Sequence, residues 1–185
     1  DAIDGYRVVE IGAEAFKECV GLEDVTIPQT VTKIGEKAFI GCKKLAHITI
    51  PEGITEIKAY TFSGCGLTSL EFPESLVEIG DYAFQNLKMQ ELTIPEHIKV
   101  FGKGIFANSA LRDVVLPDDL SNIPDNTFEN NHYLHNVKLP QSLVTIGNEA
   151  FAHCYELYSM ELPEGLISIG NRAFAACGAR VTYGL

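Results

Sequence analysis

Three kinds of residue in this sequence could carry chemistry: histidines, cysteines and clustered acids. Asp24 stands 23 residues before His47, and Ser69 stands 22 residues after it. A serine, a histidine and an acid held side by side would form a hydrolase triad. However, no nucleophile-elbow motif, oxyanion loop or pocket-forming insertion accompanies them. The pattern therefore favours a row of solvated polar side chains, and we predict no catalytic residue and no enzyme.

Each of the five cysteines stands three residues after a phenylalanine. They are Cys19, Cys42, Cys65, Cys154 and Cys177, and the corresponding residues elsewhere are Leu87, Ser109 and Asn131. A position that accepts such different residues is typical of a packing slot, sometimes with a backbone hydrogen bond. Two alternatives are weaker. Disulfides between neighbouring cysteines would join side chains that point in parallel, and zinc would require a much shorter ligand spacing.

The acids gather in two places. The segment "PDDLSNIPDN" at 117–126 holds several oxygen ligands that calcium could use, but it lacks EF-hand spacing, and its counterparts are ordinary turns. We therefore predict a solvated turn there, with calcium as the alternative. The residue after the repeated proline is also mostly acidic: Gln29, Glu52, Glu74, Glu96, Asp118, Gln141 and Glu164. This stripe favours solubility, or else it faces a basic partner.

Composition excludes several classes of function. The chain has 185 residues and a formal net charge of −11, which disfavours nucleic acid and anionic membrane surfaces as partners. No run of 18 apolar residues could insert into a membrane. Phosphate-loop, dinucleotide and metalloprotease motifs are missing, so the sequence predicts no cofactor and no metal.

The chain is an internal repeat of 22 or 23 residues. Two residue types keep this spacing independently, a phenylalanine and a proline. The phenylalanines are Phe16, Phe39, Phe62, Phe84, Phe106, Phe128, Phe151 and Phe174. The prolines are Pro28, Pro51, Pro73, Pro95, Pro117, Pro140 and Pro163. A unit of this length cannot bury its own apolar face, whereas stacked copies can.

Each repeat contains one predicted strand. In "LEDVTIP" at 22–28, apolar Val25 and Ile27 alternate with polar residues, and proline then removes a ladder donor. The strands are predicted at 22–27, 45–50, 67–72, 89–94, 111–116, 134–139, 157–162 and 179–183, all parallel. Beyond most of the prolines comes an Ile-Gly pair, whose glycine supplies a turn that a Cβ would obstruct, and beyond every proline comes an inward-facing Phe.

The recurring unit I-G-x-x-A-F-x-x-C, followed by L-x-x-[VIL]-x-[IL]-P, resembles the BspA-like class of leucine-rich repeat proteins over essentially the whole chain. The segment at 120–134 departs from the unit, with Pro124 for Gly, Thr127 for Ala and Asn131 for Cys. The resemblance implies an α/β right-handed solenoid, with a parallel concave sheet of about eight short strands and short 3-10 or irregular convex segments. We expect residues 1–185 to form a single domain, a fragment of a longer surface protein.

The resemblance also implies a non-enzymatic protein-interaction module on the surface of a bacterium or secreted from it, acting in adhesion. The partner would be a host matrix protein or a bacterial surface protein, bound by side chains that point out of the concave sheet. These are Asp24, Thr26, His47, Thr49, Ser69, Glu71, Glu91, Thr93, Asp113, Val115, Asn136, Lys138, Ser159 and Glu161. The alternative is a structural spacer or stalk. Because no polar cap closes either end, either the natural chain is longer or an end strand pairs with another molecule.

Overall fold

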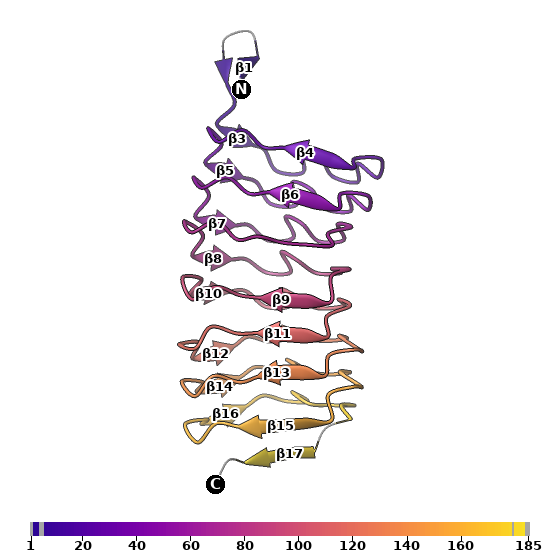
Figure 1. The fold of residues 1–185 in the computed structure, drawn as a ribbon, viewed down its shortest axis with the longest axis vertical. Helices are drawn as coiled ribbons and strands as arrows, with labels where there is room; N and C mark the ends of the chain where they lie inside the picture. The colour runs from indigo at the N-terminus through magenta and orange to yellow at the C-terminus, as the bar shows by residue number, and fades with distance from the viewer. Residues whose placement is uncertain (1, 4–5, 179, 184–185) are drawn as a thin grey trace.

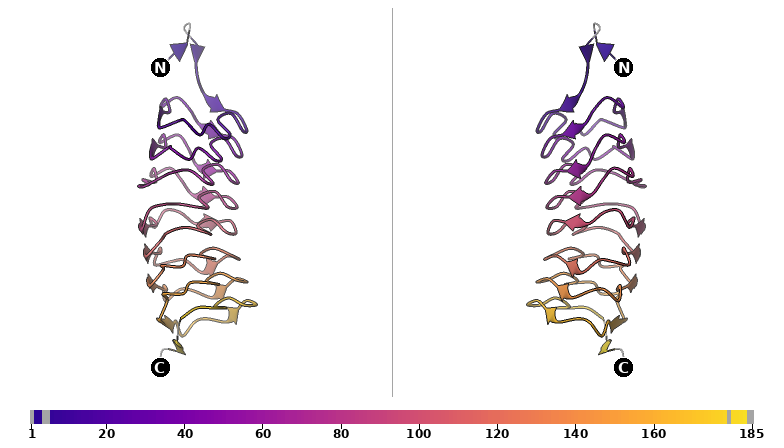
Figure 2. Two further views of the ribbon diagram at one scale, coloured as in Figure 1. Left: turned by 90° about the vertical axis from the view of Figure 1, so that its right-hand side faces the viewer. Right: turned by 90° about the vertical axis from the view of Figure 1, so that its left-hand side faces the viewer.

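In the computed structural model the repeats stack into a long solenoid of about seven turns (Figure 1). The structure describes residues 2–3, 6–178 and 180–183. Each turn has three walls, two of which are ladders of short parallel strands while the third is built of turns (Figure 2). A small antiparallel hairpin, β1 (Ala2–Ile3) and β2 (Tyr6–Arg7), precedes the first turn.

The first ladder contains the strands that the sequence predicts. They are β4 (Asp24–Thr26), β6 (His47–Thr49), β9 (Glu91–Thr93), β11 (Asp113–Val115), β13 (Asn136–Lys138), β15 (Ser159–Leu162) and β17 (Arg180–Tyr183). Every pairing within it is parallel, and equivalent residues face each other, as Asp24 faces His47. The parallel arrangement and register are confirmed, although most strands are only three residues long.

The strand predicted at 67–72 is wrong, because that rung forms no strand. It carries Phe72 where the neighbouring rungs have Ile50 and Ile94. The Phe72 ring meets the Phe84 ring edge-on, with 5.8 Å between centroids. Overpacking by a larger inward side chain forces backbone shifts, which is a physical reason for the missing ladder bonds.

The second ladder was not predicted as strands. It is made of two-residue strands: β3 (Glu10–Ile11), β5 (Lys33–Ile34), β7 (Glu56–Ile57), β8 (Glu78–Ile79), β10 (Val100–Phe101), β12 (Asn122–Ile123), β14 (Thr145–Ile146) and β16 (Ser168–Ile169). The described residues contain no α-helix and no 3-10 helix, so the α/β and 3-10 parts of the expectation are not confirmed. Two-residue strands escape prediction because they are too short to show an alternating pattern.

The third wall consists of turns that are bonded from one rung to the next. The backbone N–H groups of Lys37, Phe39 and Gly41 donate to the carbonyl oxygens of Ala59, Thr61 and Ser63, at 3.1, 2.9 and 2.8 Å. The flanking residues Lys37 and Gly41 have positive φ values of 58° and 73°. Left-handed residues four positions apart bracket this turn, and every second N–H group between them donates to the next rung, so the backbone groups of the wall are satisfied.

A continuous column of phenylalanine rings fills the interior. From Phe16 to Phe174 every neighbouring pair is stacked, with centroids 5.0–6.2 Å apart. The six rings from Phe39 to Phe151 are fully buried, while the two end rings are only partly covered. The predicted inward position of this column is confirmed, and the stack forms the core onto which all three walls pack.

Glycines let the second ladder close. Gly102 donates its N–H to the carbonyl oxygen of Ile79 at 2.7 Å, and a Cβ on Gly102 would lie 2.4 Å from the backbone nitrogen of Asp81. That is far inside van der Waals contact, so only glycine allows the rungs to approach this closely. Lys58 and Pro124 replace this glycine in two rungs. The ladder is interrupted at these two rungs, between β5 and β7 and between β10 and β12.

Candidate interaction surface

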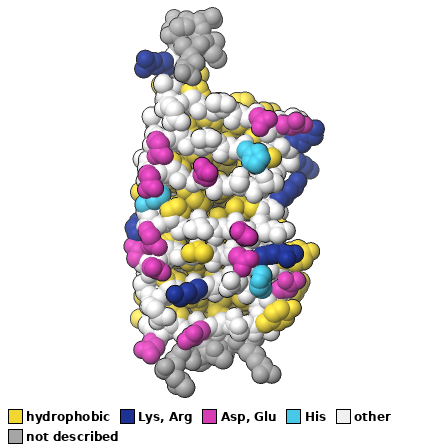
Figure 3. Space-filling view, in the orientation of Figure 1, with side chains coloured by type: hydrophobic (Ala, Val, Ile, Leu, Met, Phe, Trp, Pro, Cys, Tyr) yellow, Lys and Arg dark blue, Asp and Glu magenta, His cyan; other side chains and the backbone are white. Residues whose placement is uncertain are grey.

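The fourteen side chains predicted to bind a partner lie on one face of the solenoid. All belong to first-ladder rungs, and each rung contributes two positions on either side of one inward residue. Thirteen are exposed, and Asp113 is half-buried. We call this set the first-ladder face. Figure 3 shows this side of the solenoid as mostly backbone and uncharged surface, with hydrophobic patches, scattered acids and few cations.

The structure does not assemble a catalytic triad on this face. His47 Nδ1 lies 3.0 Å from Ser69 Oγ, so those two side chains are hydrogen-bonded. Asp24 is in register with His47, but among the described side chains no hydrogen bond or ion pair joins the two. All three residues are exposed to solvent, which leaves the hydroxyl without the dry, oriented environment that a nucleophile needs.

Two depressions lie on the first-ladder face. One, of about 540 Å³, is lined by 68–71 and 89–93, where the strand is missing. The other, of about 280 Å³, is lined chiefly by 113–116 and 138–140. The first carries the carboxylates of Glu71 and Glu91 and no cation, whereas the second includes Lys138 together with Asp113 and Asp118. The face therefore offers two shallow sites, each with more acids than cations.

The acidic stripe at the ends of the strands is partly structural. Figure 3 shows acids along the left-hand edge of the face. Glu96 accepts hydrogen bonds from the backbone N–H of Asp118, at 3.0 and 3.1 Å to its two oxygens. Glu74 lies 3.3 Å from His97 Nδ1. Sequence reasoning missed the Glu96 contact, for which the 22-residue spacing between Glu96 and Asp118 was the available signal.

The predicted packing position is confirmed for the cysteines inside the stack, where it has a definite hydrogen-bond role, whereas Cys19 in the first turn is exposed. The thiols of Cys42, Cys65 and Cys154 donate to the Phe carbonyl oxygen 26 residues earlier, at 3.0, 3.1 and 3.3 Å. Asn131 makes the same contact through its amide, 2.8 Å from the Phe106 oxygen. All five cysteines are free thiols. Burial raises the pKa of Cys65 to about 12, so this thiol stays neutral and unreactive.

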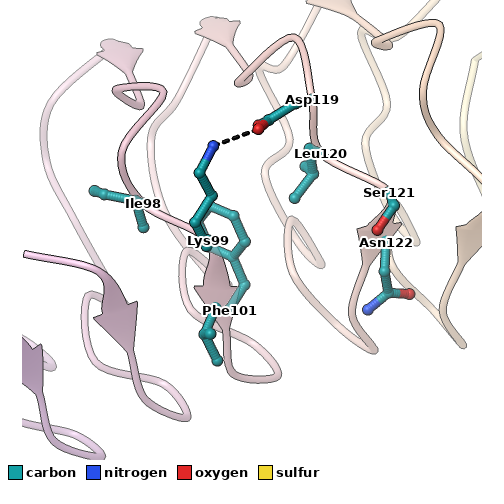
Figure 4. A pocket seen from close by; sticks show the side chains of 8 residues that line it. Ile98, Lys99, Phe101, Asp119, Leu120, Ser121 and Asn122 are labelled. Carbon is teal, nitrogen blue, oxygen red and sulfur yellow. Dashed lines mark hydrogen bonds and ion pairs between the residues drawn. The ribbon is translucent and has the colours of Figure 1, made fainter.

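The acidic segment at 117–126 does not gather its oxygens around a common point. Asp119 forms an ion pair with Lys99 between the rungs of β10 and β12, where the second ladder is interrupted. Both residues line a pocket of about 340 Å³ (Figure 4). Asp125 instead accepts hydrogen bonds from the backbone and side-chain nitrogens of Asn148, at 2.6 and 3.2 Å. Over the part of the chain that the structure describes, no group of three or more His, Cys, Asp or Glu is arranged to hold a metal ion.

A pocket lies at each of the two rungs where the second ladder is interrupted, which we call the open rungs. The one at Pro124 is lined by 98–101 and 119–122, and the one near Lys58, of about 320 Å³, includes 32–35 and 55–56. In closed rungs the glycine N–H bonds the preceding rung, as Gly147 does to the Ile123 oxygen at 2.7 Å. Proline has no N–H to donate, and no described bond joins the Lys58 nitrogen to the Ile34 oxygen. These pockets are therefore consequences of the missing glycines.

No helix in the described part of the chain is long and apolar enough to cross a membrane. Comparison with solved structures finds similar solenoids in bacteria. A leucine-rich repeat protein of T. pallidum is 37% identical, with a TM-score of 0.76, over 84% of this chain and 74% of its own. One from Bacteroides ovatus is 31% identical, with a TM-score of 0.70, over 97% of this chain and 60% of its own. This chain therefore spans less than two thirds of the Bacteroides ovatus chain.

A leucine-rich cell surface protein of Faecalibacterium prausnitzii shares the fold at 20% identity, with a TM-score of 0.53, over 96% of this chain and 70% of its own. Among curated proteins, none matches this sequence. The family model described as a BspA type leucine-rich repeat region matches residues 9–135 and 121–182, with six copies. The chain therefore belongs to the BspA-type leucine-rich repeat family.

Proposed function

We propose that this chain is a non-enzymatic protein-interaction module of a bacterial surface or secreted protein, acting in adhesion. The single observation that carries the proposal is the contrast between the two sides of each first-ladder strand. Inward residues such as Val25, Ile48 and Leu92 are apolar in every rung, whereas the outward residues differ in size and charge from rung to rung on one open face. Its placement at the cell surface is supported by membership of the BspA-type family.

The chemistry of the face favours a basic partner. It carries the carboxylates of Asp24, Glu71, Glu91, Asp113 and Glu161, whereas Lys138 is its one lysine. The formal net charge of −11 adds a long-range attraction for positively charged proteins. We therefore expect the partner, a host matrix protein or another bacterial surface protein, to present lysines and arginines to this face.

The test is capture of the partner followed by charge reversal. The chain would be used as bait against host extracellular matrix and neighbouring bacterial cells, and affinity for any captured protein would then be measured by surface plasmon resonance. The variant Glu71→Lys/Glu91→Lys should weaken binding about tenfold or more and reduce its salt dependence. Glu36→Lys, on an exposed position away from the face, is the matched control. Unchanged affinity after pooled reversals on the face would overturn the proposal.

A second candidate is a spacer or stalk, which the uninterrupted phenylalanine column favours. Stacked rings from Phe16 to Phe174 join every turn into one core. A rod of this kind could separate other parts of a longer protein without binding anything itself. Absence of any captured partner, together with loss of function in the full-length protein when repeats are deleted but not when its faces are recharged, would favour this role.

A further inference from the structure

A groove lies on a different surface, at the corner between the turn wall and the first ladder. The repeats differ in length at this corner: Lys88 and Ala110 each fill it alone, whereas His132 and Tyr133 fill it together one rung later. The two short corners next to this long one leave a groove of about 550 Å³, open to solvent. Its long-corner wall is formed by His132 and Tyr133.

A row of side-chain amides, which both donate and accept hydrogen bonds, lines the groove beside Leu87, Lys88 and Ala110. Asn86, Asn108 and Asn130 occupy the same place in three successive repeats, with φ values of 65°, 57° and 58° that asparagine tolerates well. Asn130 Nδ2 donates to Asn108 Oδ1 at 3.0 Å, which orients both amides. No carboxylate is among the lining residues, although the chain as a whole is strongly acidic.

The wall is aromatic and held in place. Tyr133 is 49% exposed, and the Arg112 guanidinium lies 5.6 Å from its ring centroid, which restrains the ring. The His132 ring stacks on the Tyr155 ring, with centroids 4.8 Å apart. Large exposed aromatic rings supply contact area at low cost in conformational entropy. The described corner therefore presents a pre-organised ring beside a row of amides.

The geometry points to an oligosaccharide as the ligand of this corner groove. Sugar hydroxyls both donate and accept hydrogen bonds, which matches side-chain amides, and the apolar face of a pyranose packs on an aromatic ring. A peptide would instead anchor a bulky side chain in a desolvated pocket. The floor is made of Leu87, Ser109 and Ala110, of which the first two are buried, and the groove above it is open to solvent and not an enclosed apolar hole. The amides repeat along the solenoid axis, so an extended saccharide would follow that axis.

The inference is tested by isothermal titration with three probes: chitohexaose and maltohexaose, which are neutral, and a hyaluronan hexasaccharide, which is acidic. Binding of at least one probe is expected, and binding of none overturns the inference. Tyr133→Ala should weaken binding about three- to tenfold through loss of the ring contact. The matched control is Tyr158→Ala, which removes a tyrosine that is 66% exposed and does not line the groove.

Two further variants, with one control, distinguish a specific site from non-specific binding. Asn108→Asp keeps the shape and the acceptor for Asn130 but removes the amide donors, so affinity should fall about fivefold. Asn122→Asp makes the same charge change on the second ladder and should have no effect. Inserting one glycine after Ala110 restores a long corner and should abolish binding while thermal unfolding stays cooperative. Binding that survives both the insertion and Tyr133→Ala would place the sugar elsewhere and overturn the inference.

Discussion

The phenylalanine column and the second ladder run side by side through the molecule, yet only one of them is continuous. Every neighbouring pair of rings is stacked from Phe16 to Phe174. The second ladder is broken twice, at the rungs of Lys58 and Pro124. The stack tolerates these breaks because side-chain packing needs only approximate rung spacing, whereas a backbone hydrogen bond must be met within tenths of an ångström.

The difference indicates which contacts the solenoid cannot lose. Removing a ring leaves a cavity that neighbouring rungs cannot fill, and a cavity in the core is costly. Losing one ladder bond at the surface lets water satisfy the freed groups, so the net cost is small. The repeat therefore keeps phenylalanine in all eight units, while the glycine is replaced in some of them.

The largest effect is expected from breaking the continuous column. Phe84 is fully buried and contacts the rings of Phe62, Phe72 and Phe106. Phe84→Ala should lower the free energy of unfolding by about 3–5 kcal/mol, measured by urea denaturation. Phe174→Ala, at a partly buried end ring, should cost clearly less. Equal costs at the two positions would contradict the view that the column acts as one buried core.

The next effect comes from forcing a closed rung open. In Gly102→Ala the new Cβ would lie 2.4 Å from the Asp81 nitrogen, so the rungs must separate. We expect a loss of about 1–3 kcal/mol in the free energy of unfolding. Lys58→Ala is the control, because that rung already accommodates a Cβ and the side chain is exposed. If both substitutions cost the same, close approach is not the reason for the glycine.

A smaller effect should appear as a pH dependence of the cysteine column. The folded pKa of Cys65 is about 12, above the ordinary 9.0. Its stabilising contribution is therefore complete below pH 9 and is lost as the pH rises from 9 to 12. Compared with Cys65→Ser, the wild-type chain should lose about 1 kcal/mol of additional unfolding free energy between pH 8 and pH 10. If urea denaturation gives the wild-type and Cys65→Ser chains the same dependence of unfolding free energy on pH, Cys65 is not buried as a neutral thiol.

The smallest effect is expected from closing an open rung. Pro124→Gly restores an N–H that could donate to the Phe101 carbonyl. The bond gains about 0.5–1.5 kcal/mol, while the lost proline costs about 0.4–1 kcal/mol through the unfolded state, so net stability should change little. Hydrogen exchange is the sensitive measurement, and the amide of the new glycine should be protected. A freely exchanging amide would mean that Phe101, which replaces the usual isoleucine, holds the rung apart.

The first ladder could be predicted from the sequence, whereas the second ladder could not. The Phe and Pro spacings predicted the repeat and the parallel register of the first ladder, and the alternation of apolar and polar residues predicted the outward position of His47 and Lys138. The second ladder was missed because two-residue strands carry no periodic signal. The replacement of glycine by Lys58 is visible in the sequence, but its consequence depends on how closely two rungs approach, which only coordinates give.

The features of the candidate sites also fall into two groups, those that the sequence determines and those that depend on the tertiary structure. The sequence by itself determined that the cysteines share one structural position, because Leu87, Ser109 and Asn131 take their place in other repeats. It also determined which strand residues face outward, because alternation fixes the side of the sheet. Only the tertiary structure decided that the thiols bond Phe carbonyls, that rungs open at Lys58 and Pro124, and that a groove lies beside Tyr133. These features arise between residues more than twenty positions apart, where a one-residue difference in repeat length or one missing glycine changes the contact between rungs.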